Sequence, residues 1–357
     1  MTTRTTVPAQ AGPSPAPPTP PAPAGRAPAR SLEELVGGTP LVRIDSGTPT
    51  TTLYAKLESA NPLSSVKDRT GLYMIEAAER RGDLPRHGGT VVEASSGNTG
   101  ISLAALSAAR GHACVIVLPD SATRERVQLL KAFGAEVVLT PAEEGYTAAI
   151  EKAEELHRAR PGSWFARQHE NTDNVAAHYA TTGPEIWADT GGRLDVLVVG
   201  VGTGGTLSGT ARYLKERHAG LRVVAVEPER SPVLSEGWGG LHRIPGLNGG
   251  FVADTTDTAL IDEVITVSDD DAFDTARRLA RTAGLLVGVS SGAAAHAARL
   301  VAARPEHAGQ TVVTLFPDTG ERYLSWLETA DDAGPAASGD GDDPAAPTPS
   351  TAEETVR

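Results

Sequence analysis

The sequence predicts an α/β fold with an open, mostly parallel β-sheet and flanking helices, and two observations support this prediction. First, short β-rich runs alternate with Ala- and Leu-rich stretches through the middle of the chain. Second, runs such as Val196–Gly200 and Cys114–Leu118 are continuously apolar, as is typical of parallel strands buried on both faces. Alternating strands and helices over this length indicate crossover connections between parallel strands.

The expected strands are the runs rich in β-branched residues, at 53–57, 90–94, 113–118, 136–139, 195–199, 222–227, 263–267 and 311–316. The expected helices are the Ala- and Leu-rich stretches between most of them, for example at 68–81, 99–110, 124–133, 145–158, 206–217, 270–283 and 292–303. The segment 228–258 interrupts this rhythm. It is rich in glycine and proline, which predicts a long loop of the kind that is usually functional or mobile.

The two ends of the 357-residue chain differ in composition from the rest. Residues 1–30 contain nine prolines and no acidic or aromatic residue, and residues 331–357 contain seven acidic residues among Pro, Gly, Ser and Ala. Neither segment has enough apolar side chains to offset the entropy lost on ordering. We therefore expect two disordered tails around a folded segment of about residues 31–330.

Charge and composition exclude several classes of protein. The formal net charge of −13 argues against binding to nucleic acid or to an anionic membrane surface. No apolar run reaches the roughly 18 residues of a membrane span, and the proline-rich start lacks the apolar core of a secretory signal. The single cysteine, Cys114, excludes an internal disulfide and a thiolate metal cluster, and the nine histidines show no metal-ligand spacing. We therefore expect a cytoplasmic protein with no metal site.

The first chemical signal is the glycine-rich turn Gly200–Gly205, which follows an apolar strand and opens a helix. Its glycines let successive N–H groups point into one concavity, and a concavity at a helix N-terminus attracts phosphate. The turn also satisfies the pattern GxGxxG, and Glu227 ends the following strand. An NAD-dependent oxidoreductase is therefore a real alternative at this point.

Three other turns are left unexplained by that alternative. The polar turn Ser95–Gly100 opens a helix and could receive a carboxylate, although it could also serve only as a helix cap. Within Ser64–Arg69, Lys67 lies in a first helical turn, where a cation opposes the helix dipole. Desolvation and the helix end favour the neutral amine, the form that attacks an aldehyde. The turn Gly288–Ala293 opens another helix and is a weak signal alone.

A reactive lysine and a phosphate-binding turn together point to pyridoxal phosphate, and here the chain resembles a known family. From about residue 37 to 325 it is similar to the fold-type II pyridoxal-phosphate enzymes of the cysteine synthase (O-acetylserine sulfhydrylase) and cystathionine β-synthase family. The resemblance is carried, in this order, by the segments GGTPLVRI, AKLESANPLSSVKDR, EASSGNTG, KAFGAEVVLTP, TTGPEIW, GVGTGGTLSG, VGVSSGAA and FPDTGERYLS.

The resemblance implies cofactor-binding roles for residues at matching positions. Lys67 would be the catalytic Schiff-base lysine, Asn98 would bond the phenolic oxygen of the cofactor, and Ser290 would bond its pyridine nitrogen. The phosphate would be held by the glycine-rich turn, at Gly202, Thr203, Gly204, Gly205 and Thr206.

The resemblance also implies a binding site for the α-carboxylate of the substrate, formed by Ser95, Ser96, Thr99 and Gln168. Two departures from the family pattern bear on substrate or nucleophile choice. Ser95 stands where the family usually has threonine, and Asn248 stands where it often has glycine.

The fold implied by the family is two open, twisted, mostly parallel sheets with flanking helices and the cofactor between them. Residues 31–57 plus 171–330 would form the larger, phosphate-binding domain, and residues 58–170 the smaller, mobile domain with Lys67 and the carboxylate loop. The family also implies a homodimer.

The implied activity is β-replacement on an activated L-serine, such as O-acetyl-L-serine, with sulfide, giving L-cysteine through an α-aminoacrylate intermediate. The partners would be a small amino-acid substrate and a small nucleophile. The alternatives are another β-replacement with a cystathionine or 2,3-diaminopropionate-type product, the NAD-dependent oxidoreductase, and a non-catalytic member of the family that binds a partner.

Overall fold

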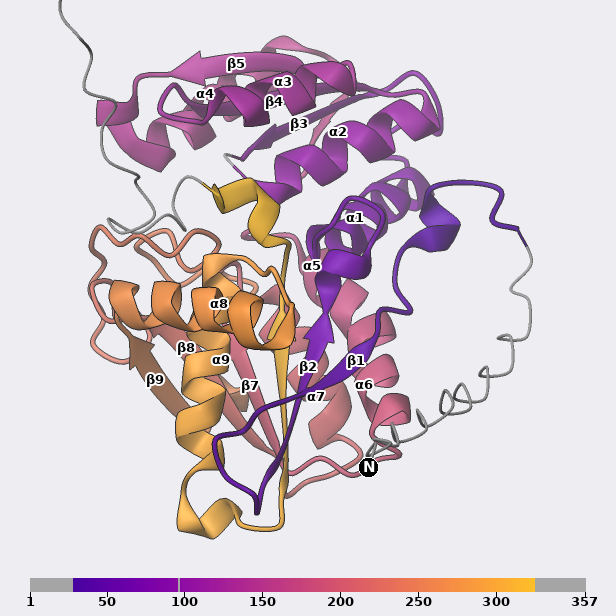
Figure 1. The fold of residues 1–357 in the computed structure, drawn as a ribbon. Helices are drawn as coiled ribbons and strands as arrows, with labels where there is room; N and C mark the ends of the chain where they lie inside the picture. The colour runs from indigo at the N-terminus through magenta and orange to yellow at the C-terminus, as the bar shows by residue number, and fades with distance from the viewer. Residues whose placement is uncertain (1–27, 96, 325–357) are drawn as a thin grey trace, which may run out of the picture.

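The computed structural model describes residues 28–95 and 97–324, and within them two β-sheets form, each flanked by helices (Figure 1). This arrangement confirms the predicted fold class. Apart from residues 28–30, the two predicted tails lie outside the described residues.

The larger sheet has six strands in the order β1-β2-β10-β7-β8-β9. All neighbours are parallel except β1, which pairs antiparallel with β2 at one edge. The bounds are β1 Leu41–Ile44, β2 Thr52–Leu57, β7 Val196–Gly200, β8 Arg222–Pro228, β9 Glu263–Val267 and β10 Thr311–Phe316.

The smaller sheet has four parallel strands in the order β5-β4-β3-β6. Its bounds are β3 Thr90–Ala94, β4 Ala113–Pro119, β5 Glu136–Thr140 and β6 Ser163–Phe165. Helices α2, α3 and α4 accompany this sheet in Figure 1, and α1 lies beside α5 between the two sheets.

The α-helices are α1 Lys67–Arg81, α2 Asn98–Arg110, α3 Arg124–Ala132, α4 Gly145–Ala159, α5 Thr172–Ala177, α6 Gly183–Asp189, α7 Gly205–Lys215, α8 Asp269–Ala283 and α9 Val289–Ala302. None of the described helices is both long enough and apolar enough to cross a bilayer.

Alternation along each strand divides the core between the two faces of a sheet. In β7, Val196 and Val198 pack in the cluster with α8 and α9, whereas Leu197 and Val199 pack in the cluster with α6 and α7. Successive side chains of a strand point to opposite faces, so a continuously apolar strand is buried on both. The only cysteine, Cys114, is 5% exposed in β4 and belongs to the core between the smaller sheet and α1 and α2.

The structure contains three features that the sequence pattern did not predict. The first two are short strands, β1 and β6. The third is the run from α5 to α6, which is joined through a π-helical segment at His178–Thr182. Pro184 lies in the first turn of α6, where a missing N–H leaves no intrahelical bond unmade.

Candidate active site

A cleft of ≈ 550 Å³ lies where the strands of both sheets end, and a smaller cavity of ≈ 50 Å³ adjoins it. Both are lined by Lys67, Asn98, Gly202, Thr203 and Gly246. In parallel α/β sheets the carboxyl ends of the strands are the usual place for ligands. The structure thus brings the predicted lysine, the polar turn and the glycine-rich turn to one place.

Lys67 is the first residue of α1 and is half-buried. Its backbone carbonyl accepts a hydrogen bond from Ser102 Oγ at 3.0 Å, which ties it to α2. Burial lowers the pKa of Lys67 to about 8. About a tenth of the Lys67 amine is therefore neutral at pH 7, and the neutral form is the one that acts as a nucleophile or a general base.

The backbone before Lys67 is held against the end of β10. Val66 N donates to Pro317 O at 2.8 Å, and Ser65 forms a β-bridge with Asp318. The lysine that begins α1 is therefore positioned by the larger sheet.

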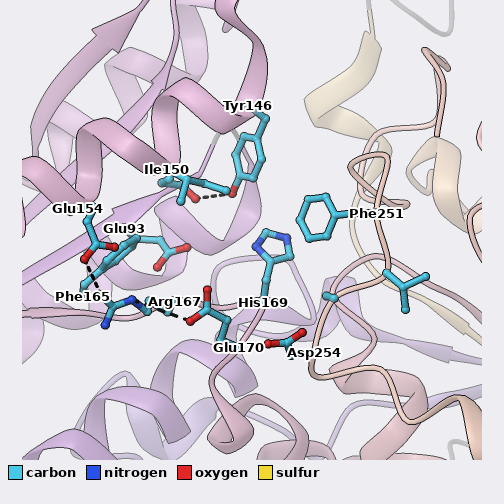
Figure 2. Close-up of a pocket in the computed structure, with 13 residues that line it drawn as sticks. Glu93, Tyr146, Ile150, Glu154, Phe165, Arg167, His169, Glu170, Phe251 and Asp254 are labelled. Carbon is cyan, nitrogen blue, oxygen red and sulfur yellow. Dashed lines mark hydrogen bonds and ion pairs between the residues drawn. The ribbon is translucent and has the colours of Figure 1, made fainter. Parts of the chain in front are cut away.

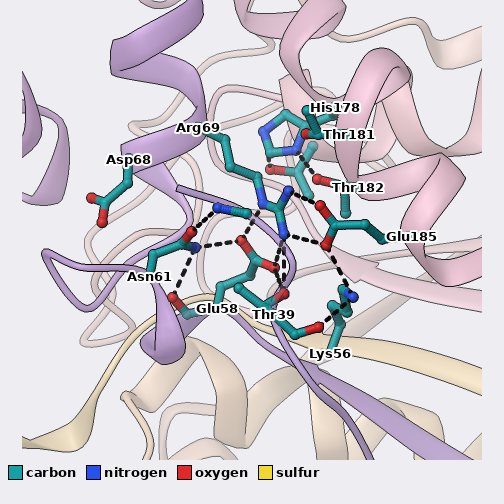
Figure 3. Close-up of polar contacts among 12 residues, drawn as sticks. Thr39, Lys56, Glu58, Asn61, Asp68, Arg69, His178, Thr181, Thr182 and Glu185 are labelled. Atoms are coloured by element: carbon teal, nitrogen blue, oxygen red, sulfur yellow. Dashed lines mark hydrogen bonds and ion pairs between the residues drawn. The ribbon is translucent and has the colours of Figure 1, made fainter. Parts of the chain in front are cut away.

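Arg69 anchors the same helix through a buried cluster of charges (Figure 3). Its guanidinium bonds both carboxylate oxygens of Glu58, at 2.7 and 3.0 Å, and both of Glu185, at 2.6 and 2.7 Å. Neither Arg69 nor Glu58 exposes any side-chain surface. Lys56 extends the cluster through an ion pair with Glu185 at 3.0 Å. Since Glu58 follows β2 and Glu185 lies in α6, the cluster ties α1 to both.

The glycine-rich turn forms a concave backbone at the start of α7. Gly204 has a left-handed φ of +80°, and a Cβ there would lie 2.0 Å from Thr256 Oγ1. A Cβ on Gly202 would lie 2.3 Å from the carbonyl oxygen of Gly246. The backbone N–H groups of residues 202–204 donate no hydrogen bond to any other residue that the structure describes. An anion with several acceptor oxygens fits this set of donors.

Polar side chains complete the smaller cavity. Thr206 Oγ1 is 3.1 Å from Nε2 of His178, and burial keeps the pKa of that imidazole well below its usual range, so the ring is neutral. Thr203 Oγ1 accepts a hydrogen bond from Nδ2 of Asn174 at 2.9 Å. Ser290, in the first turn of α9, is 4% exposed and lines the same cavity. These five side chains are all uncharged. They could therefore hydrogen-bond a heteroaromatic ring without placing a charge beside it.

Asn98 begins α2 and its amide is fixed on both sides. Nδ2 donates to Oδ2 of Asp318 at 2.7 Å, and the guanidinium of Arg322 donates to Oδ1. Burial raises the pKa of Asp318, although Tyr323 and Asn98 donate to its carboxylate. The second hydrogen of the Asn98 amide is left for a ligand in the cavity.

The carboxylate loop lies at the N-terminus of α2. Thr99 Oγ1 donates to Oε1 of Gln168 at 2.6 Å, and both residues line the cleft. Ser95 Oγ accepts from the backbone N–H groups of Gly97 and Gly100 at 3.3 and 3.0 Å, so it supports the turn while facing the cleft. Ser96 lies outside the described residues.

Three residues of the site, Tyr146, Asp318 and Arg322, were not predicted from the sequence. Tyr146 lines the cleft beside Gln168, with its hydroxyl 3.4 Å from Nε2 of that residue. Asp318 and Arg322 lie in the segment FPDTGERYLS, whose resemblance to the family was the available signal. The long loop supplies Pro245, Gly246, Leu247 and Gly249 to the lining of the cleft.

Two residues of interest point away from the cleft. Asn248 is 3% exposed, and its amide exchanges hydrogen bonds with Ser231, at 2.8 and 2.9 Å, inside the loop. The carboxylate of Glu227 is buried and accepts from Leu234 N, Ser235 N and Ser235 Oγ at 2.6–3.0 Å. Glu227 caps a turn and does not line the cavity, so it cannot bind a ribose as the dinucleotide interpretation requires.

Comparison with known proteins shows which family and which enzymes this chain resembles. Residues 32–318 match the family described as pyridoxal-phosphate dependent enzyme. Cysteine synthase of Staphylococcus aureus strain Mu50 is 46% identical over 301 residues, which covers 84% of this chain and 96% of that protein.

Solved structures of related enzymes also align with most of this chain. Cysteine synthase (OASS) from Entamoeba histolytica aligns with a TM-score of 0.82 at 39% identity, over 86% of this chain and 92% of that one. O-acetylserine dependent cystathionine β-synthase from Helicobacter pylori aligns with a TM-score of 0.79 at 40% identity, over 84% of this chain and 98% of that one.

Proposed function

Because the chain belongs to the family of pyridoxal-phosphate dependent enzymes, we propose that it is a cysteine synthase that makes L-cysteine from O-acetyl-L-serine and sulfide. The overall reaction breaks the bond between Cβ and the ester oxygen, so that acetate leaves with the electron pair, and forms a C–S bond at Cβ.

The residues of the smaller cavity fit pyridoxal 5'-phosphate. The N–H groups of residues 202–204 and the start of α7 would hold the phosphate, since nothing else among the described residues takes those donors. Ser290 would meet the pyridine nitrogen and the Asn98 amide the phenolic oxygen. When bound, pyridoxal phosphate supplies an electron sink that makes the Cα proton acidic and lets the β-substituent leave.

The chain's own groups bind the amino acid and move its proton. The Lys67 amine, partly neutral because burial lowers its pKa to about 8, takes the proton from Cα and returns it after the nucleophile has added. Thr99, Gln168 and the N–H groups at the start of α2 orient the α-carboxylate. These groups place Cα within reach of Lys67 and leave the β-carbon open to the nucleophile.

One observation carries the proposal: a desolvated lysine lies in the wall shared by an anion-binding turn and a carboxylate-binding loop. The test is to supply the purified protein with pyridoxal phosphate, O-acetyl-L-serine and sulfide, and to measure cysteine and acetate. We expect the two products in equal amounts and no turnover by Lys67→Ala. The exposed Lys131→Ala is the matched control. Absence of cysteine, or full activity of Lys67→Ala, would refute the assignment.

We further propose a homodimer in the cytoplasm with residues 31–57 plus 171–330 as the larger domain and 58–170 as the smaller. Strands β3 to β6 all lie within 58–170, which supports the division. Light scattering tests the dimer and cell fractionation the location. Hydrogen exchange should change most within 58–170 when O-acetyl-L-serine binds, if this domain closes over the substrate.

A further inference from the structure

A side cavity of ≈ 180 Å³ opens next to the main cleft and takes no part in the chemistry described so far (Figure 2). It lies between α4 and the end of β3 on one side and the loop segment 251–254 on the other. Tyr146 and His169 line both this cavity and the cleft that contains Lys67. The two cavities are therefore adjacent, and a molecule that spans them passes these two rings.

The side cavity is acidic in a specific way. Four of its lining residues are acidic and one is basic: Glu93, Glu154, Glu170 and Asp254 against Arg167. Arg167 is shared by Glu154 at 2.9 Å and Glu170 at 4.0 Å. No ion pair to Glu93 or Asp254 is found among residues 28–95 and 97–324. These two carboxyl groups, on opposite walls, therefore form no ion pair, although the charge of Arg167 acts on Glu93 and opposes the effect of burial on its pKa.

Glu93 is the clearest sign that a ligand belongs here. It is 2% exposed, and its Oε2 has no hydrogen-bond partner among the described residues. A buried polar atom without a partner is costly and uncommon. Burial raises the pKa of Glu93 to about 8. A positive donor in the side cavity would satisfy Oε2 and stabilise the carboxylate form.

The rings of the cavity wall favour an organic cation. His169 packs 5.8 Å from Tyr146 and 5.2 Å from Phe251, measured between ring centroids. Burial and the charge of Lys67 lower the pKa of His169 to about 4, so it adds no positive charge. Aromatic faces attract ammonium groups. No group of three or more metal-ligating side chains occurs among the described residues, so a metal ion is a poorer fit.

We propose that the side cavity binds the primary ammonium group of a nucleophile that reacts in the main cleft, so that small aminothiols serve as second substrates beside sulfide. The inference rests on the proposed β-replacement. In that step the thiol sulfur bonds to the β-carbon of O-acetyl-L-serine, the C–O bond breaks, and acetate leaves with the electron pair. The thiol proton goes to solvent.

The test compares cysteamine with 2-mercaptoethanol, two thiols of similar size of which only the first carries an ammonium group. The measured quantity is the ratio of their kcat/KM values with O-acetyl-L-serine. We expect this ratio to fall about tenfold in Glu93→Gln and in Asp254→Asn, mainly through the KM for cysteamine, since one charge-assisted contact is lost. Comparing ratios cancels the difference in intrinsic reactivity of the two thiols.

Two controls make the result decisive. Glu151→Gln removes an exposed carboxylate from α4, the helix that borders the cavity, at a position outside the lining, and should leave the ratio unchanged. Ethylammonium has no thiol. It should inhibit the wild type competitively against cysteamine, with an inhibition constant that rises about tenfold in Asp254→Asn.

The outcomes separate the inference from the function on which it rests. If the wild type makes cysteine from sulfide but the ratio is unchanged in both variants, the side cavity is not an ammonium site. If buried Glu93→Gln does not fold, the exposed Asp254→Asn decides alone. If the wild type makes no cysteine, the proposed function itself falls.

Discussion

Removing the charge of Arg69 should cost more stability than any exposed substitution in α1. Arg69→Met keeps the aliphatic stem but leaves Glu58, which exposes no side-chain surface, without a cation. Breaking a buried ion pair from one side costs about 3–5 kcal/mol. The exposed pair Arg80–Glu76 is 3.7 Å apart on the same helix, so Arg80→Met should cost less than about 1 kcal/mol.

Urea unfolding followed by far-UV circular dichroism measures both values. Adding Glu58→Gln to Arg69→Met should recover about 1–3 kcal/mol, because the stranded charge is then removed. If Arg69→Met loses no more than Arg80→Met, or if Glu58→Gln restores nothing, the cluster does not anchor α1 in the way described.

The same cluster predicts a pH window. Burial opposes the ionisation of Glu185, but its hydrogen bonds and ion pair with Arg69 lower its pKa from 4.5 to about 2. A depressed pKa stabilises the folded state above the unfolded value. The contribution of Glu185 is therefore present above pH 4.5 and lost as the pH falls toward 2. The stability difference between wild type and Arg69→Met should shrink across that window, and a constant difference would contradict the argument.

Three further predictions concern the site. Because the pKa of Lys67 is about 8, uptake of pyridoxal phosphate by the cofactor-free protein should slow about tenfold per unit below pH 8 and level off above it, as stopped-flow absorbance can show; a flat profile from pH 6 to 9 would contradict this. Gly204→Ala should raise the Kd for pyridoxal phosphate at least about tenfold in a fluorescence titration, because a left-handed residue and a clash enter the turn. Gly111→Ala, also left-handed but with open space around its Cβ, should leave that Kd unchanged. Thr99→Val should raise the KM for O-acetyl-L-serine about tenfold, because Gln168 loses the hydrogen bond that Thr99 donates, while the affinity for pyridoxal phosphate stays constant. If the affinities for substrate and cofactor fell equally, the loop would belong to the cofactor site.

The elements that the sequence predicted best are those whose local pattern and final environment agree. Three strands, β3, β9 and β10, have the expected bounds, since each is a compact run rich in β-branched residues between turns. The short strands β1 and β6 were missed because they are stabilised by pairing with neighbours already in place. The helical run from α5 to α6 was not predicted because it contains Gly183 and Pro184, which usually indicate the end of a helix. Proline is nevertheless tolerated in the first turn, where Pro184 lies.

The residues of the site likewise include some that could be predicted from the local sequence and some that could not. Lys67 and the Gly202–Thr206 turn could be found because each pattern has a chemical meaning within a few consecutive residues. The charge cluster around Arg69 could not, since it joins residues as far apart in the sequence as Lys56 and Glu185. The unpartnered Oε2 of Glu93 could not be predicted for a related reason. Only the packing of β3 against α4 and the 251–254 loop shows that its Oε2 lacks a partner.

The burial of Cys114 has a consequence for the redox behaviour of the protein. Burial raises the pKa of its thiol to about 12, so near neutral pH it is protonated as well as shielded in β4. Disulfide exchange requires a thiolate. A protein that handles sulfide and releases cysteine therefore has no thiolate of its own, among its 357 residues, with which oxidised product could form a mixed disulfide. It should keep working without added reductant as cystine accumulates around it.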